Sequence, residues 1–283
     1  MDNKQFYLAV KDHAVTGESF ELFYDSELDM LETHPQPGKD DVVRYYKSKD
    51  YISHTDSKRN LFEKLYHRVR RMSLKRKLKI INNAISESKR LLDIGCGTGD
   101  FLSLAMEDAW DVTGIEPNDK ARAVANMKTD NKVFDSPYIN QLDDGSFDVI
   151  TLWHVLEHLP DLDEQISKLS TLLKSDGRLI IAVPNFKCFD AGYYKSYWAA
   201  YDAPRHFWHF SQSAIEKLFL NEKMTIQETK PLKYDAYYVS LLSEKYKSGW
   251  MNFFNAFFVA TRSNLKAART GEYSSLIYII IKA

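Results

Sequence analysis

Three glycines at alternate positions follow a short apolar run and lead into a helical pattern. The run is Leu91 to Ile94, and the glycines are Gly95, Gly97 and Gly99. A short run that is apolar apart from Asp93 is typical of a buried strand in a parallel sheet. Because glycine lacks a Cβ, the chain can turn tightly and a ligand can approach its backbone. The following helix adds free N–H donors and a partial positive charge. The segment therefore predicts a strand, a ligand-binding turn and a helix.

The spacing of these glycines separates two kinds of nucleotide-binding loop. The dinucleotide fingerprint G-x-G-x-x-G requires its third glycine at position 100, which is Asp100. The chain instead has G-x-G-x-G preceded by Asp93. This form resembles the first motif of class I S-adenosylmethionine-dependent methyltransferases. An NAD-type oxidoreductase is the disfavoured alternative.

Three further motifs extend the resemblance. Glu116 ends the next expected strand, where a carboxylate can accept hydrogen bonds from ribose hydroxyls. Segments 145–159 and 172–185 are similar to the strand-four and strand-five motifs of the same family, in the same order. The resemblance spans Leu91 to Asn185 and points to the ubiquinone-biosynthesis O-methyltransferase-like branch. It implies S-adenosylmethionine as the cofactor.

Strand and helix patterns alternate through this region, which predicts a Rossmann-like α/β fold with helices on both faces of the sheet. The resemblance implies seven mostly parallel strands, the last one antiparallel between the fifth and sixth. Ser211 suits the N-cap of a helix over 213–220. The expected strands are 91–94, 111–116, 132–134, 147–152, 178–183, 224–229 and 276–281.

Three parts of the chain are expected. Residues 1–37 alternate like a small β-hairpin module, and residues 38–85 form a linker with a strongly basic helix over 58–80. Residues 86–283 form the methyltransferase domain, with long insertions at 186–210 and 233–272 that we expect to act as helical caps over the substrate. Aromatic residues crowd both insertions.

Bulk composition narrows the class of protein. A net charge of −1 gives no global basic field for nucleic acid, and the 44% hydrophobic content is enough for a sizeable core. The two cysteines, Cys96 and Cys188, indicate no disulfide framework. No run is long enough for a membrane span, and no signal-peptide pattern is present. A cytoplasmic protein is expected.

The resemblance assigns the cofactor site residue by residue. Glu116 is expected at the ribose hydroxyls, Pro117 and Asn118 beside the adenine, and Asp135 at its amino group. Trp153 and His154 are expected near the methionine end, beneath an aromatic cover. The remaining expected cofactor-binding residues are Asp93, Gly95, Cys96, Gly97, Thr98, Gly99, Tyr46 and Tyr51.

Methyl transfer from a sulfonium requires alignment of the acceptor more than a fixed catalytic triad. Since a histidine titrates near neutral pH, His154 and His206 are the candidate general bases. His154, Glu157 and His158 occupy positions where a divalent metal has been proposed in the ubiquinone branch. We assign no metal here, although His154 and His158 lie four residues apart.

The segment 201–211 resembles the "Pro-Arg-His, then His-Phe-Ser" segment found after strand five in one branch of these enzymes. Polar groups among aromatics suit a pocket that orients a substrate. A structural ion pair between Asp202 and Arg205 is the equally weighted alternative. The expected substrate-binding residues are Asp202, Arg205, His206, His209, Tyr197 and Trp198.

The sequence therefore predicts an S-adenosylmethionine-dependent methyltransferase that acts on a small, lipid-like or aromatic acceptor, at oxygen. Two alternatives stay open. The basic helix over 58–80 would suit a tRNA or other nucleic-acid methyltransferase, although nucleic acid is not the favoured partner. A cofactor-binding protein without catalytic activity would carry the same loop. The acceptor and the oligomeric state do not follow from the residues.

Overall fold

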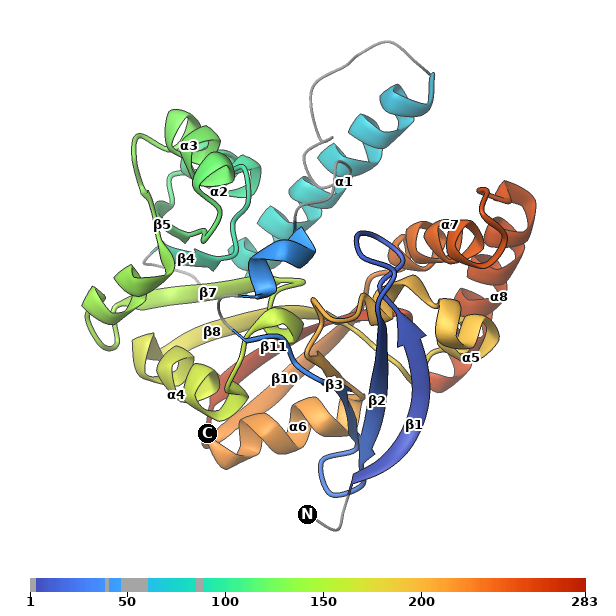
Figure 1. The fold of residues 1–283 in the computed structure, drawn as a ribbon. Coiled ribbons are helices and arrows are strands. Elements are labelled where there is room, and N and C mark those ends of the chain that lie inside the picture. Colours follow the sequence, from blue (N-terminus) through green and yellow to red (C-terminus); the bar gives the residue numbers. More distant parts are fainter. Residues whose placement is uncertain (1–3, 39–40, 47–60, 85–88) are drawn as a thin grey trace.

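A seven-stranded sheet forms the centre of the computed structural model, which describes residues 4–38, 41–46, 61–84 and 89–283 (Figure 1). Its strand order is β10-β11-β8-β7-β4-β5-β6, so the first strand of the glycine motif, β4, lies well inside the sheet. The predicted fold class is confirmed. The strands are β4 (Arg90–Ile94), β5 (Asp111–Ile115), β6 (Val133–Phe134), β7 (Phe147–Trp153), β8 (Leu173–Pro184), β10 (Met224–Pro231) and β11 (Ser275–Lys282).

The last strand runs antiparallel between β8 and β10, as expected. Strands β4 to β8 pair in parallel. The run from Leu276 to Ile280 in β11 is buried on both sides, which suits an interior strand rich in β-branched residues. Because β4, β5 and β7 are parallel, the segments that follow them emerge at one edge of the sheet, where open α/β sheets bind ligands.

Helices cover both faces of the sheet because neighbouring strand residues point to opposite sides. On one face Leu91 packs with Ile81 and Phe101, whereas on the other Leu92 packs with Ile166 and Ile215. The helices of the two layers are α1 (Leu61–Ala84), α2 (Asp100–Glu107), α3 (Asp119–Lys128), α4 (Leu162–Leu172) and α6 (Gln212–Asn221). Ser211 caps α6, since its hydroxyl accepts from the Ala214 N–H.

The N-terminal module is larger than the predicted hairpin. Three strands, β1 (Lys4–Lys11), β2 (Ser19–Asp25) and β3 (Met30–His34), pair antiparallel. A fourth strand, β9 (Trp208–His209), joins the edge of β3 from the insertion that follows β8. This pairing joins a strand of the predicted 1–37 module to a strand of the predicted 86–283 domain. The division into 1–37, 38–85 and 86–283 stays a prediction.

Both insertions are mainly helical. The first contains α5 (Phe189–Tyr194), and the second forms two packed helices, α7 (Asp235–Ser248) and α8 (Phe253–Thr270). In Figure 1 these helices lie beside the N-terminal strands, and the His13 ring in the β1–β2 turn stacks on Tyr246 of α7 with ring centroids 4.8 Å apart. Short 3-10 helices complete the chain at Val42–Tyr46, Ser136–Gln141, Leu156–His158, Lys195–Tyr197 and Ala199–Tyr201.

The search for membrane-spanning segments among the described residues gives a negative result. Across the ranges that the structure describes, each helix is too short or too polar to cross a bilayer.

Candidate active site

The glycine turn after β4 has the backbone that its sequence predicts. Gly95, Gly97 and Gly99 all have positive φ angles, of 68°, 57° and 75°. A Cβ on Gly99 would lie 2.9 Å from atoms of Ala125, so only glycine allows α3 to pack this closely. A Cβ on Gly97 would meet no atom within 4 Å. The loop is therefore packed against the protein at Gly99 and open to a ligand at Gly97.

Glu116 ties this loop to the end of β5. Its buried carboxylate accepts hydrogen bonds from the backbone N–H of Gly97 at 2.8 Å and of Asn118 at 2.9 Å. Burial raises the pKa of Glu116, and these two donors act against that effect. Pro117 and Asn118 are exposed, and the Asn118 side chain caps α3. Glu116, Pro117 and Asn118 lie beside the loop, and their roles toward the cofactor stay predictions.

Asp93, at the end of β4, points into the protein. Its carboxylate is buried and accepts a hydrogen bond from the Thr151 hydroxyl at 2.6 Å. Burial raises its pKa to about 7, against the lowering effects of Thr151 and the Lys77 charge. Cys96 and Thr98 contribute little through their side chains. Burial raises the pKa of the Cys96 thiol, and the Thr98 hydroxyl donates to Asp100.

Lys77 of α1 is a candidate site residue that sequence reasoning missed. Its ammonium group lies 4.6 Å from the centroid of the Trp153 ring and 5.9 Å from that of Phe101. It therefore places a positive charge beside Trp153 at the end of β7. The sequence does not single out Lys77, because many other lysines and arginines lie in the same basic helix.

His154 follows β7 in a left-handed conformation with φ of 59°, which directs its ring toward α7. Its Nε2 lies 3.0 Å from the Asp235 carboxylate and its Nδ1 lies 3.5 Å from that of Glu157. Burial acts to lower the pKa of His154, but Asp235 and Glu157 outweigh it and raise the pKa to about 10. The imidazole is then protonated at neutral pH and has no lone pair, which counts against its predicted role as a general base.

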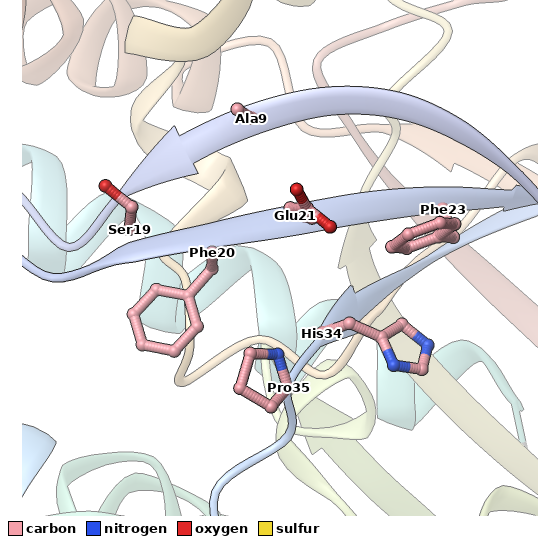
Figure 2. Close-up of a pocket in the computed structure, with 7 residues that line it drawn as sticks. All are labelled: Ala9, Ser19, Phe20, Glu21, Phe23, His34 and Pro35. Carbon is pink, nitrogen blue, oxygen red and sulfur yellow. The ribbon is translucent and has the colours of Figure 1, made fainter.

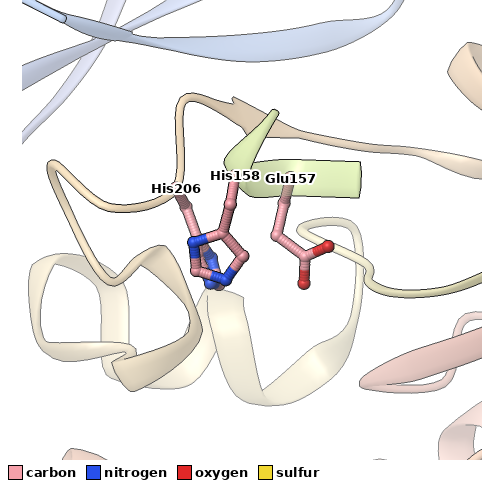
Figure 3. Close-up of side chains that lie close together, drawn as sticks. All are labelled: Glu157, His158 and His206. Carbon is pink, nitrogen blue, oxygen red and sulfur yellow. The ribbon is translucent and has the colours of Figure 1, made fainter. Parts of the chain in front are cut away.

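Glu157, His158 and His206 form a second polar group, the Glu-His-His cluster (Figure 3). One nitrogen of each ring and a Glu157 carboxylate oxygen lie within 4.8 Å of one another. Burial lowers the pKa of His158 to about 4, so its ring is neutral. The segment packs on the glycine loop, since a Cβ on Gly95 would lie 2.5 Å from the Val155 side chain.

Arg205 lies in a buried ion pair, in agreement with the structural alternative. Its guanidinium group contacts the carboxylate of Asp202 at 2.6 Å and that of Asp12 at 3.2 Å. It also donates to the Tyr45 carbonyl oxygen at 2.9 Å. With its donors used inside the protein, Arg205 holds the insertion against the N-terminal sheet, and the predicted substrate contact of Asp202 and Arg205 has no support in this geometry.

Three further predicted substrate residues, His209, Trp198 and Tyr197, are not part of the Glu-His-His cluster. His209 is buried, and its Nε2 lies 3.0 Å from the Thr33 hydroxyl; the Trp198 indole is also buried and donates to Asp190. Both side chains therefore pack within the protein. Tyr197 is partly exposed, and its ring lies 5.6 Å from that of His13.

The structure describes one of the two predicted cover residues, Tyr46, and also Asp135, which is predicted to contact the adenine. The Tyr46 hydroxyl lies 3.1 Å from Nδ1 of His158, so Tyr46 covers the Glu-His-His cluster. Asp135 is exposed after β6 and precedes a short 3-10 helix. Tyr51 lies outside the described residues.

A pocket of about 520 Å³ lies elsewhere, on the N-terminal sheet (Figure 2). It contains no residue of the glycine loop or of the Glu-His-His cluster, and we assign it no role. Its lining residues are Ala9, Ser19, Phe20, Glu21, Phe23, His34 and Pro35.

Comparison with known proteins decides the family. A family model described as a methyltransferase domain matches residues 57–223, which is more than half of the chain. The chain belongs to this methyltransferase family. The resemblance seen in the glycine loop and the strand-end motifs is thereby confirmed, and the matched region contains both the loop and the Glu-His-His cluster.

Curated relatives match part of this methyltransferase. The chain is 33% identical over 120 residues to a ubiquinone biosynthesis O-methyltransferase of Aromatoleum aromaticum, covering 39% of this chain and 51% of that protein. It is 30% identical over 122 residues to the enzyme of the same name from Coxiella burnetii, covering 40% and 52%. The chain thus spans about half the length of the curated relatives it matches.

Solved structures share the fold of this methyltransferase. A SAM-dependent methyltransferase from Archaeoglobus fulgidus has a TM-score of 0.51 at 19% identity and covers 79% of this chain and 100% of that one. Geranyl diphosphate C-methyltransferase from Streptomyces coelicolor has a TM-score of 0.54 at 14% identity and covers 81% and 86%. At these identities the likeness concerns the fold.

Proposed function

We propose that the chain is an S-adenosylmethionine-dependent methyltransferase that methylates a small, lipid-like or aromatic acceptor at an oxygen atom. The observation that carries the proposal is the Glu116 carboxylate at the open side of the glycine loop, bonded to the Gly97 N–H. Family membership supports the reaction type, and the names of the curated relatives support transfer to oxygen.

The cofactor binds along the glycine loop in this proposal. Two acceptor oxygens of Glu116 bind the ribose hydroxyls, and the open space above Gly97 admits the nucleoside. Lys77, beside the Trp153 ring, pairs with the carboxylate of the methionine part. A charge-assisted pair of this kind is stronger than a neutral hydrogen bond.

The acceptor oxygen must reach the methyl carbon in line with the sulfur and must lose its proton. Alignment inside a site that excludes water supplies much of the rate enhancement, on the order of 7–11 kcal/mol. We assign removal of the proton to the Glu-His-His cluster, because protonated His154 cannot accept it. The positive charge of His154 instead favours a negative acceptor oxygen nearby.

The alternative of a nucleic-acid methyltransferase has less support. It rests on the basic helix over 58–80, but two of its basic groups face the protein. Arg76 donates to the Pro231 carbonyl oxygen at 2.6 Å, and Lys77 lies over the Trp153 ring. The side chains of residues 61–70 lie outside the described part of the chain.

Transfer of a labelled methyl group from S-adenosylmethionine tests the proposal. The purified chain is incubated with separate lipid, phenolic-metabolite and RNA fractions, and label is counted in each after extraction. We expect label in a small-molecule or lipid fraction, as a methyl ether identified by mass spectrometry. Label confined to RNA, or bound cofactor without transfer to any fraction, would overturn it.

A further inference from the structure

The Glu116 carboxylate is held by two peptide groups whose opposite ends are bonded to other parts of the protein. The Asn118 N–H donates to one carboxylate oxygen, and the Gly97 N–H donates to the other. A peptide unit is planar and trans, so its C=O and its N–H point in opposite directions. The groups that bind the Pro117 and Cys96 carbonyl oxygens therefore also orient the two N–H groups that hold Glu116.

Arg122 of α3 binds the first of these two carbonyl oxygens. Its Nη1 lies 3.2 Å from the Pro117 carbonyl oxygen and 2.8 Å from that of Glu116, and it donates to both. The guanidinium group also pairs with Asp119, three positions earlier, and its side chain is only 21% exposed. Because it bridges two consecutive carbonyl groups, Arg122 fixes the turn between β5 and α3. It thereby fixes the direction of the Asn118 N–H.

Lys128, at the other end of α3, acts on the glycine loop. Its ammonium group donates to the Thr98 carbonyl oxygen at 3.0 Å. The Gly99 N–H belongs to the same peptide unit as that carbonyl, and it donates to the Cys96 carbonyl oxygen at 3.1 Å. The Cys96 carbonyl in turn shares its peptide unit with the Gly97 N–H, which reaches the Glu116 carboxylate.

These bonds form one chain that begins and ends on the same helix. From Lys128 the chain passes through two peptide units of the glycine loop to Glu116, and from Glu116 through one peptide unit to Arg122. Along it, the N–H of each peptide unit points toward the carboxylate and the C=O points toward a cation. Hydrogen bonds aligned in this way polarise and strengthen one another. Both cations thus act on Glu116 through the backbone.

The helix that carries both cations has a fixed position relative to the sheet. Ala125, between them in the sequence, is fully buried, and its Cα and Cβ are the atoms that a Cβ on Gly99 would meet first. The Asn126 side chain donates to the Val133 carbonyl oxygen and accepts from the Val133 N–H, which ties α3 to β6. Because α3 is anchored at both the loop and the sheet, its two cations can hold the segments that flank Glu116 in place.

The two cations differ in strength. Burial raises the pKa of Glu116, and two backbone N–H groups and the Arg122 charge act against this effect. Lys128 is 36% exposed, and its ammonium group also lies 2.9 Å from the Asp100 carboxylate. Solvent and Asp100 therefore screen the charge of Lys128, so we expect Arg122 to make the larger contribution.

We propose that Arg122 and Lys128 are positioning residues of the cofactor site, which hold the Glu116 carboxylate in the orientation that binds the ribose hydroxyls. This inference rests on the proposed function and adds α3 to the parts of the chain that determine cofactor affinity. An Arg122 that only stabilised the turn between β5 and α3 would change protein stability without a preference for ligands that carry ribose hydroxyls.

Calorimetric titration of the full chain with S-adenosylhomocysteine tests the role of Arg122. Arg122→Met removes both carbonyl contacts and keeps a long aliphatic side chain. We expect the dissociation constant to rise roughly fivefold, as for the loss of one net hydrogen bond. We expect a rise of only about twofold in Lys128→Met, because that contact is screened. Lys120→Met, which removes an exposed cation from the same helix, is the matched control and should bind as wild type does.

Two further measurements separate positioning from a purely structural role. In Arg122→Met, affinity for the 2′-deoxy analogue of S-adenosylhomocysteine should fall less than affinity for S-adenosylhomocysteine itself. This ratio compares two ligands on one protein, so partial misfolding of the variant does not change it. In the Glu116→Gln background, adding Arg122→Met should change affinity by less than about twofold, since the two residues act as one unit.

Three results would overturn the inference and leave the proposed function intact. They are unchanged affinity in Arg122→Met, equal losses for the two ligands, and an undiminished loss in the Glu116→Gln background. Wild type that binds no S-adenosylhomocysteine would instead overturn the proposed function, and the positioning role with it.

Discussion

The guanidinium group of Arg205 lies 3.2 Å from the carboxylate of Asp12, a residue 193 positions earlier in the chain. Asp12 also accepts from the backbone N–H groups of Ala14, Val15 and Thr16, so it fixes the β1–β2 turn at the same time. One buried contact thus joins the N-terminal sheet to the insertion that supplies His206. The placement of the Glu-His-His cluster depends on it.

Replacing Arg205 by methionine should therefore destabilise the protein strongly. The change leaves the buried Asp12 carboxylate, and the partly buried Asp202 carboxylate, without their cation. Removing one partner of a buried ion pair typically costs about 3–5 kcal/mol. Urea unfolding followed by circular dichroism measures the loss. Arg44→Met, which removes an exposed ion pair with Glu18, is the matched control and should have a much smaller effect. Equal losses in the two variants would contradict the structural role of Arg205.

Glycines 97 and 99 should respond differently to alanine. Both have positive φ angles, so each substitution costs roughly 1–2 kcal/mol in backbone strain. Only at Gly99 does the new Cβ collide with Ala125, which adds about 1–3 kcal/mol of overpacking. We expect Gly99→Ala to lose more unfolding free energy than Gly97→Ala. Gly97→Ala should mainly weaken binding of S-adenosylhomocysteine, because its Cβ enters the open space. The reverse order of stabilities would refute this account of the loop.

The ion pair between His154 and Asp235 predicts a pH dependence. The pKa of His154 rises from 6.5 to about 10 in the folded protein. A histidine whose pKa is higher in the folded state stabilises the protein fully at pH values below its unfolded-state pKa. This contribution to the unfolding free energy is lost as the pH rises from about 6.5 through 10. The unfolding free energy of wild type should therefore fall over this interval more steeply than that of Asp235→Asn. Because the ring is 39% exposed, solvent screens part of the effect. Parallel pH profiles would show that His154 is not charged by this pair.

Lys77 should contribute to cofactor affinity. Lys77→Met keeps the aliphatic contact with Trp153 but removes the charge that we assign to the methionine carboxylate. Loss of such a charged hydrogen bond typically costs about 1.5–3 kcal/mol, so the dissociation constant of S-adenosylhomocysteine should rise roughly tenfold or more. Lys75→Met, an exposed neighbour on α1, serves as control and should bind as wild type does. Unchanged affinity in Lys77→Met would remove this contact from the proposal.

The central sheet was predictable because its signals are local. The apolar run before Gly95 and the run at 276–281 each identify a buried strand from consecutive residues. Ser211 likewise marks the start of α6 through a cap that joins it to Ala214, three positions later. The position of the last strand in the sheet came from the resemblance, and the observed pairing with β8 and β10 confirms it.

The cluster was not predictable in the same way, since its geometry depends on contacts between distant segments. The i, i+4 spacing of His154 and His158 assumed a helix, but the left-handed backbone of His154 turns its ring toward Asp235 instead. The partner that joins Glu157 and His158 is His206, which is placed by the pairing of β9 with β3. Two residues of strand pairing between remote segments leave no periodic pattern in a sequence. For the same reason the sequence left open whether Arg205 contacts a ligand or forms an ion pair, because its buried partner Asp12 is remote in the chain.

Titration of wild type and Glu116→Gln with S-adenosylhomocysteine tests the cofactor site most directly. Isothermal calorimetry gives the affinity, circular dichroism checks the fold of the variant, and NAD is titrated as the competing cofactor class. We predict that wild type binds S-adenosylhomocysteine and does not bind NAD. We predict at least about tenfold weaker binding by Glu116→Gln, because a carboxylate accepts charge-assisted hydrogen bonds from the ribose that an amide replaces poorly. Equal affinity in the two proteins would contradict the role of Glu116, and wild type that binds NAD but not S-adenosylhomocysteine would contradict the methyltransferase proposal itself.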